Sequence, residues 1–245
     1  MLRKQVHSLV VANKGGNKFS VHSFVLENTQ MMTTGAIAEQ RVVLRNISWQ
    51  TFKAMLAETG EDRVSRMTYD RGTLEIMTPL MPHERANRQI ERLIWILVEE
   101  LGLNILSVGS MTCKREDLER GAEPDSSYYI QNEPLVREKD EINLAEDPPP
   151  DLVLEVEYSR SAINKLRLYA SMRVPELWRY DGRSLRIYRL DKEEYHLCEN
   201  SPTFAPIAVS EIPRFIKETK NIGEVAMVQS FRVWVRQQLD PYSGK

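Results

Sequence analysis

The alternation of hydrophobic and polar residues is most informative between Asp151 and Glu157. The triple proline at positions 148–150 stops any preceding element and leaves the chain extended. The run from Leu152 to Val156 is rich in Val and Leu, and it has the length of a buried strand. Because strand side chains alternate, Asp151, Glu155 and Glu157 share one face. Acids at the end of a buried strand are costly unless a positive group meets them, so the pattern indicates a functional site or a salt bridge.

Apolar residues at helical spacing predict several helices along the chain. Ser48 is the expected N-cap of the first helix, and Gly60 and Gly102 are expected to end the first two. Ser161 is the expected cap of the helix that follows the buried strand. The predicted helices span residues 48–60, 82–101, 161–173, 210–217 and 224–239.

Short β-prone runs bounded by turn residues predict the strands. The runs lie at residues 64–69, 73–77, 105–113, 126–130, 151–157, 176–180, 185–190 and 195–198. The first two form a hairpin in which Gly72 takes positive φ, and the last three form an antiparallel meander. The charged segments 114–121 and 133–146 are expected to be loops.

Together these elements predict an α/β (α+β) fold, with a mixed β-sheet flanked by helices, a C-terminal antiparallel meander and terminal helices. Residues 41–240 are expected to form a single domain. Residues 1–40 carry little periodic pattern and are expected to be a weakly patterned N-terminal extension.

Composition narrows the classes of function. The chain has 245 residues, of which 42% are hydrophobic and 28% charged, as in an ordinary globular protein. A net charge of -2 argues against a protein that coats nucleic acid non-specifically, although a local basic groove stays compatible with it. The 2 cysteines are too few for a disulfide framework or a thiolate zinc site. With no apolar run of membrane-spanning length and no signal-peptide core, the sequence predicts a cytoplasmic protein.

Three residues on adjacent predicted elements suggest a chemistry. Asp125 begins one strand, Glu155 lies on the buried strand, and Lys165 lies in the first turn of the next helix. Carboxylates bind Mg²⁺, which activates water, and a lysine can orient that water and stabilise charge on a phosphate. The alternative for Lys165 is a lysine whose stem covers apolar surface while its amine reaches water. His83 falls on the inward side of its helix and is expected to make a local hydrogen bond.

Four sequence blocks carry a family resemblance. They are Pro124-Asp125, Pro150 to Val156, Lys165 to Tyr169 and Val174 to Trp178. In this order they resemble a large bacterial family of uncharacterised, predicted restriction endonucleases with the PD-(D/E)XK nuclease fold. The stretch from Met77 to Leu101 is similar to the N-terminal part of that family, and the resemblance covers about residues 45 to 190.

The resemblance implies a DNA endonuclease that hydrolyses phosphodiester bonds with Mg²⁺, or Mn²⁺, as its cofactor. Asp125 and Glu155 resemble the metal-binding acids, and Lys165 resembles the catalytic lysine, displaced in this family from the strand onto the helix. DNA is then the expected substrate. Cleavage of both strands would need two active sites, which suggests a homodimer.

Glu157 is the main departure, because it occupies the position of the lysine in the nuclease motif. It is expected to point outward, to form a salt bridge with Lys165 or Arg160, or to be an extra metal ligand. Together with the modest net charge, Glu157 motivates an alternative hypothesis, a catalytically inactive nuclease-fold protein that binds DNA or another protein. A weaker third hypothesis is an enzyme that acts on another phosphate substrate. Basic residues that could meet a phosphate backbone, or form an ordinary solvated surface, are Lys114, Arg115, Arg137, Lys139, Arg160 and Arg167.

Overall fold

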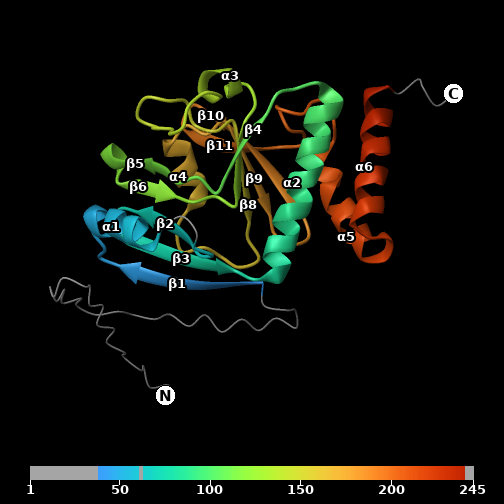
Figure 1. The fold of residues 1–245 in the computed structure, drawn as a ribbon. Coiled ribbons are helices and arrows are strands. Elements are labelled where there is room, and N and C mark those ends of the chain that lie inside the picture. The colour runs from blue at the N-terminus through green and yellow to red at the C-terminus, as the bar shows by residue number, and fades with distance from the viewer. Residues whose placement is uncertain (1–37, 61–62, 241–245) are drawn as a thin grey trace, which may run out of the picture.

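The strands of the protein are divided between two sheets in the computed structural model, which describes residues 38–60 and 63–240 (Figure 1). Within these residues, the first sheet has the order β1-β3-β2-β6-β5, and all its pairings are antiparallel. Its strands are β1 (Glu39–Arg45), β2 (Arg66–Asp70), β3 (Thr73–Pro79), β5 (Cys113–Arg115) and β6 (Arg120–Ala122). The predicted α+β class is confirmed, with strands in two sheets instead of one.

The second sheet has the order β11-β10-β9-β8-β7-β4 within the described part of the chain. Its strands are β4 (Leu106–Gly109), β7 (Ser126–Tyr129), β8 (Leu152–Val156), β9 (Glu176–Tyr180), β10 (Leu185–Asp191) and β11 (Glu194–Cys198). Strands β8 and β9 run parallel, whereas the other neighbours in this sheet are antiparallel. The predicted meander is confirmed as β9, β10 and β11.

Helices cover both faces of the second sheet. The α-helices of the described residues are α1 (Trp49–Thr59), α2 (Met81–Leu101), α3 (Glu133–Val136), α4 (Lys165–Ser171), α5 (Ile212–Ile222) and α6 (Glu224–Leu239). Helices α2, α5 and α6 lie together at one side of the sheet, and α4 lies at the other (Figure 1). Among the described residues, no helix is long and apolar enough to cross a membrane.

The side chains of β8 divide between two cores. Leu152, Leu154 and Val156 belong to the large core beneath α2, α5 and α6. Val153 belongs to a second core with Leu168 of α4. The alternation predicted from the sequence is therefore confirmed, and it turns the neighbouring acidic positions of β8 toward α4.

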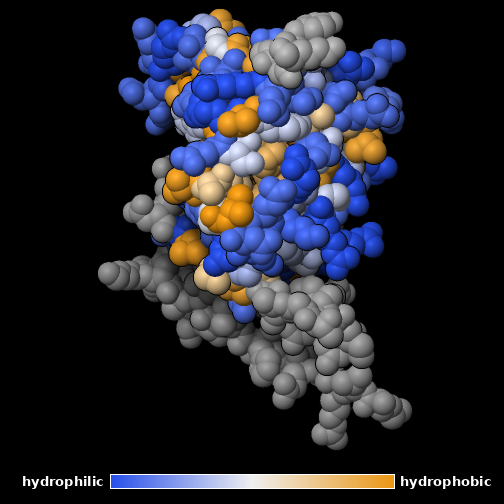
Figure 2. All heavy atoms as spheres, turned by 90° about the vertical axis from the view of Figure 1, so that its right-hand side faces the viewer, coloured by the Kyte–Doolittle hydropathy of each residue, from blue (hydrophilic) through white to orange (hydrophobic). Residues whose placement is uncertain are grey.

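The surface over α5 and α6 is mainly hydrophilic (Figure 2). Apolar side chains form small patches there, and Ile222, Val225 and Val233 are exposed. Isolated exposed apolar residues are normal on a protein surface.

Helix α1 packs on the first sheet through an aromatic cluster. Ser48 Oγ accepts a hydrogen bond from Thr51 N at 3.1 Å, which confirms the predicted N-cap. The rings of Phe52 and Tyr69 stack with their centroids 5.0 Å apart. Gly121 on β6 lies directly against the Phe52 ring, so the close approach of helix and sheet depends on a residue without a side chain.

Other element boundaries differ from the prediction. The single strand expected at residues 105–113 is two strands, β4 and β5, which belong to different sheets. The loop expected at residues 114–121 is the β5–β6 hairpin. Of its paired strand residues only Cys113 and Ala122 are buried and apolar, and the charged residues between them hide the strand alternation. The short helix expected at residues 210–217 is α5, which continues to Ile222.

Helix α4 begins at Lys165 instead of after Ser161. Asn164 caps it by accepting a hydrogen bond from Arg167 N at 3.1 Å, while the Ser161 hydroxyl binds Glu75 at 2.9 Å. At the other end of the chain, β1 begins at Glu39, just before the predicted domain boundary at residue 41. The predicted extension lies almost wholly outside the described residues.

Gly121→Ala should lower the free energy of unfolding by about 1–3 kcal/mol, because the added methyl overpacks the cluster. Its Cβ would lie 2.6 Å from the ring of Phe52, which is fully buried and held by Tyr69. Urea denaturation measures the change, and Phe52→Leu should restore part of the loss in the Gly121→Ala background. An unchanged midpoint in Gly121→Ala would contradict this packing.

Candidate active site

Asp125 lies at the entry to β7, where Pro124 keeps the chain extended. The pairing of Ser126 with Leu154 continues by one residue to set Asp125 opposite Glu155. Asp125 Oδ2 accepts a hydrogen bond from Val156 N at 2.7 Å. The carboxylate is therefore fixed against β8, beside the acid that the sequence singles out.

Glu155 meets Lys165 and Tyr169, which are one helical turn apart on α4 and share its inward face. Lys165 Nζ donates a hydrogen bond to Glu155 Oε2, and the Tyr169 hydroxyl donates to Glu155 Oε1 at 2.5 Å. The Lys165 side chain is only 4% exposed. Lys165 is therefore not a surface lysine whose amine reaches water, and the structure places it beside Glu155, with Asp125 on the neighbouring strand.

Glu157 is buried instead of pointing outward. Arg179 Nε donates a hydrogen bond to Glu157 Oε2 at 3.1 Å, and Lys165 Nζ lies 3.8 Å from Glu157 Oε1. The expected salt bridge is thus made with Arg179 and Lys165 and not with Arg160. Glu157 Oε1 has no hydrogen-bond partner among the described residues, so it can accept a further donor.

The first sheet adds charged residues that the sequence reasoning missed. Arg41 of β1 donates hydrogen bonds to Glu39, at 3.0 Å, and to Glu75 of β3. Glu39 accepts from Ser159 N, and Glu75 accepts from Ala162 N, both at 2.7 Å. These bonds tie the first sheet to the loop that precedes α4, and so they help to place Lys165. The one local signal is that Glu39 and Arg41 are two residues apart in a strand and therefore share a face.

His83 is fully buried between the two sheets. Its Nε2 lies 3.4 Å from Asp125 Oδ2 and 3.7 Å from Glu39 Oε2. Neither ring nitrogen has a hydrogen-bond partner in the described part of the chain, so the expected local hydrogen bond is not formed. The contacts of His83 are electrostatic, and they place it beside the candidate site.

Asp151 is separate from this cluster, although it belongs to the same strand pattern. Its carboxylate accepts hydrogen bonds from Ile130 N at 2.7 Å and from Asn132 N at 2.9 Å. It therefore closes the turn after β7 and has a structural role.

The charges of the site shift the pKa values of its residues. Burial raises the pKa of Glu155 above its usual range, Lys165 opposes this effect, and Asp125 adds to it. Burial alone would lower the pKa of Lys165, but the charges of Glu155 and Glu157 outweigh burial and raise it. Burial alone would raise the pKa of Asp125, but the neighbouring His83 outweighs burial, so the pKa of Asp125 lies below its usual range. At neutral pH the site therefore holds a lysine cation beside an ionised Asp125.

The donor set determines how a metal could be held. Within residues 38–60 and 63–240, no group of three or more His, Cys, Asp or Glu side chains is placed to hold a metal ion by itself. Mg²⁺ commonly takes one or two carboxylates and fills its shell with water and substrate oxygens. Asp125 Oδ1 is buried without a hydrogen-bond partner in the described structure, although Arg66 Nε lies 3.2 Å away. Asp125 and Glu155 therefore fit a hydrated oxygen-ligated ion.

The fold and the site together define an α+β protein with a buried acid–acid–lysine centre. The model of the Uma2 family, described as "Putative restriction endonuclease", matches residues 49–216 of the chain. The protein belongs to this family, which confirms the resemblance found in its sequence.

The comparison with solved structures finds a chain whose structure is similar. It is titled as a "putative nuclease belonging to DUF820" from Anabaena variabilis ATCC 29413. The two chains are 16% identical, the match covers 74% of this chain and 99% of that one, and the TM-score is 0.49. The comparison with curated proteins gives no match.

Lys165→Met should lower the free energy of unfolding by about 3 kcal/mol or more, because Glu155 and Glu157 would then share a buried site without the amine. Urea denaturation at neutral pH measures the loss. Lys217→Met, at an exposed position of α5, is the matched control and should change stability by less than about 0.5 kcal/mol. Equal small effects of the two substitutions would show that the Lys165 amine is not paired.

His83→Gln should destabilise the protein more at pH 6 than at pH 9. Burial alone would lower the pKa of His83, but Asp125 and Glu39 outweigh burial and raise it above 6.5. A raised pKa gives stability that is present below the unfolded value of about 6.5 and is lost as pH rises through the folded value. Denaturation of both proteins at the two pH values measures this, and a difference that is larger at pH 9 would contradict it.

Proposed function

We propose that the protein is a Mg²⁺-dependent DNA endonuclease that hydrolyses phosphodiester bonds at Asp125, Glu155 and Lys165. The observation that carries the proposal is the buried contact of the Lys165 amine with Glu155, on a strand whose register sets Asp125 opposite. Membership of the family described as "Putative restriction endonuclease" supports the same chemistry. Mn²⁺ accepts the same oxygen ligands and is the natural substitute.

Asp125 and Glu155 would hold the ion. Asp125 contributes an oxygen that has no hydrogen-bond partner among the described residues, and β8 fixes its other oxygen. Glu155 is held by Lys165 and Tyr169, and each of its oxygens keeps a second lone pair. When bound, the ion would lower the pKa of a coordinated water and neutralise charge on the phosphate.

Lys165 supplies the cation of the site from the protein itself. Its amine is buried, and three carboxylates raise its pKa, so it stays charged at neutral pH. A fixed ammonium in a water-poor site stabilises negative charge on a phosphate oxygen and orients a water by donating a hydrogen bond. Glu157 Oε1 lies 3.8 Å from Nζ, and Arg179 anchors the same side chain through its other oxygen, Oε2. Glu157 therefore serves to position Lys165 in this mechanism.

The internal pairing of the acids supports a second candidate, a nuclease-fold protein that binds DNA or a protein without cleaving it. Arg41 pairs with Glu39 and Glu75, and Arg179 pairs with Glu157. These cations neutralise much of the acidic cluster without a metal. The two candidates differ in whether the acids bind a divalent ion and in whether DNA is cut.

Purified protein should convert supercoiled plasmid to nicked circles with Mg²⁺ or Mn²⁺, and Asp125→Ala and Lys165→Ala should each reduce the rate by about a hundredfold or more. Agarose electrophoresis over time gives the rates, and EDTA should stop the reaction. Lys217→Ala, at an exposed position of α5, is the matched control and should cut as fast as wild type. Equal nicking by wild type and by the two site variants would contradict the proposal, because the activity would then come from a contaminant. Absence of cutting in wild type, with DNA binding kept, would favour the second candidate.

A further inference from the structure

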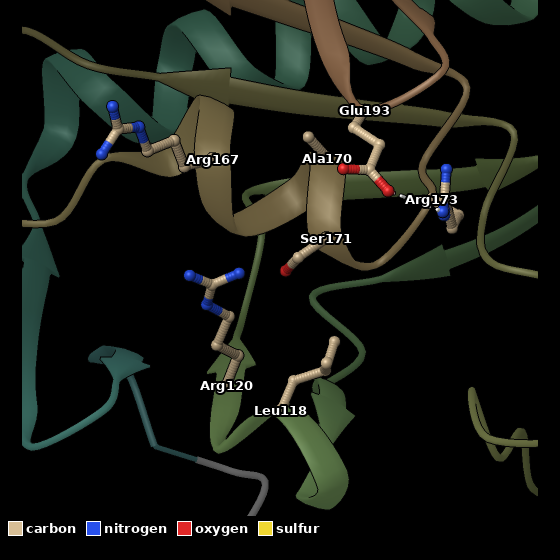
Figure 3. A pocket seen from close by; sticks show the side chains of 7 residues that line it. All are labelled: Leu118, Arg120, Arg167, Ala170, Ser171, Arg173 and Glu193. Carbon is tan, nitrogen blue, oxygen red and sulfur yellow. Dashed lines mark hydrogen bonds and ion pairs between the residues drawn. The ribbon is translucent and has the colours of Figure 1, made fainter.

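A cavity of about 390 Å³ lies on the outward side of helix α4, opposite the face that carries Lys165 and Tyr169 (Figure 3). Its walls come from the short turn before β6, from α4 and its C-terminal end, and from the β10–β11 turn. Three of its lining residues are arginines, Arg120, Arg167 and Arg173, and one is an acid, Glu193. The cavity therefore gathers positive charge in a chain whose net charge is -2.

Most of the other predicted backbone-binding residues are occupied by neighbouring acids. Arg115 pairs with Asp117, Arg137 with Glu133, and Lys139 with Asp147. The guanidinium of Arg167 makes no hydrogen bond or ion pair with the described residues. In Figure 3 the Arg167 guanidinium extends away from Arg120 and Ser171, and without a partner among the described residues it is free to turn toward a ligand in the cavity.

The guanidinium of Arg120 is oriented by an ion pair with Asp70. Its side chain is 13% exposed, and its Nε donates a hydrogen bond to Asp70 Oδ1 at 2.9 Å. The two terminal nitrogens of the guanidinium make no hydrogen bond within the described chain, and in Figure 3 they point toward α4 beside Ser171. A guanidinium oriented at Nε, with both terminal nitrogens open, matches the oxygens of a phosphate.

Arg173 closes the cavity at its rim. It donates to Lys192 O at 2.6 Å and to Glu193 Oε1 at 3.3 Å. The Glu193 side chain is 81% exposed, so its pair with Arg173 contributes little, and an incoming anion can replace it.

We propose that this cavity is a phosphate-binding site in which Arg120 and Arg167 take the oxygens of a phosphoryl group. The lining has no aromatic residue on which a base could stack, and its apolar wall consists of Leu118 and Ala170. It therefore recognises the phosphate and not a nucleobase. The phosphate can come from a nucleic-acid backbone or from a free phosphate compound, and the choice of the first rests on the proposed function.

The helix connects this cavity to the candidate active site. Lys165 and Ser171 are the first and last residues of α4, and six residues of helix span about 9 Å. That length is close to the axial rise of about three base pairs of duplex DNA. Because the cavity and Lys165 lie on opposite faces of α4, the width of the helix, about 10 Å, adds to this axial length, and a backbone phosphate in the cavity would lie more than three base pairs from a phosphate at Lys165.

The test uses the full chain in EDTA, so that cleavage plays no part. A short fluorescent DNA duplex is titrated over a range of salt concentrations with wild type, Arg167→Gln, Arg120→Gln/Arg167→Gln and the control Lys217→Gln. Lys217 is exposed on α5, at the far side of the molecule from α4 (Figure 1). In parallel, inorganic phosphate is compared with chloride at equal ionic strength for its effect on the melting temperature.

The double variant should bind DNA roughly tenfold more weakly. The slope of log affinity against log salt concentration should fall by about one, because both arginines bind one phosphate and each lost phosphate contact removes about one unit. Arg167→Gln should weaken binding about half as much on a logarithmic scale. It removes no side-chain hydrogen bond or ion pair among the described residues, so its effect would not come from a broken internal pair. Lys217→Gln should match wild type. Unchanged DNA binding, with phosphate stabilisation lost in Arg167→Gln, would support the site with a free phosphate as its ligand.

If neither DNA affinity nor phosphate stabilisation depends on Arg120 and Arg167, the proposal is wrong. This outcome is distinct from failure of the nuclease assignment. Plasmid nicking that is equal in wild type and Lys165→Ala would remove the proposed activity, while the arginine-dependent binding would still stand.

Discussion

The ion pair between Lys165 and Glu155 is the interaction on which the site depends. Both side chains are buried, so neither could be charged at an acceptable cost without the other. The pair holds the start of α4 against β8, and the Tyr169 hydroxyl, one turn along the helix, holds the second oxygen of Glu155. Strand, helix and the reactive groups are therefore set by the same few contacts.

Residues of the first sheet, which are distant from Lys165 in the sequence, also help to hold the site in place. Glu39 and Glu75 bind the backbone of the loop between β8 and α4, and Arg41 bridges the two acids. Because that loop leads directly into Lys165, the first sheet fixes where the amine lies. His83, at the start of α2, joins the two parts through Asp125 and Glu39. A charged network at the junction of two sheets is a rigid support for a site that must hold its geometry within a fraction of an ångström.

The core of the site could be predicted from the sequence because its residues follow local rules. Alternation along β8 placed Glu155 and Glu157 on one face, and helical spacing placed Lys165 beside Tyr169. The partners from the first sheet could not be found in this way, since Glu39 meets Ser159 across 120 residues of chain. Pairing between distant segments leaves no periodic pattern, and for the same reason the division of residues 105–113 between two sheets was missed. Glu157 shows the limit clearly, because its burial depends on Arg179, a neighbour in space from β9.

The central claim is that two of the buried acids, Asp125 and Glu155, are a divalent-metal site and not only one half of an internal salt-bridge network. Calorimetric titration of the full chain with Mn²⁺ tests this most directly. The account predicts saturable binding that Asp125→Asn and Glu155→Gln each abolish and that Glu58→Gln, at an exposed position of α1, leaves unchanged. Binding that persists in Asp125→Asn, or its absence from the wild-type protein, would contradict it.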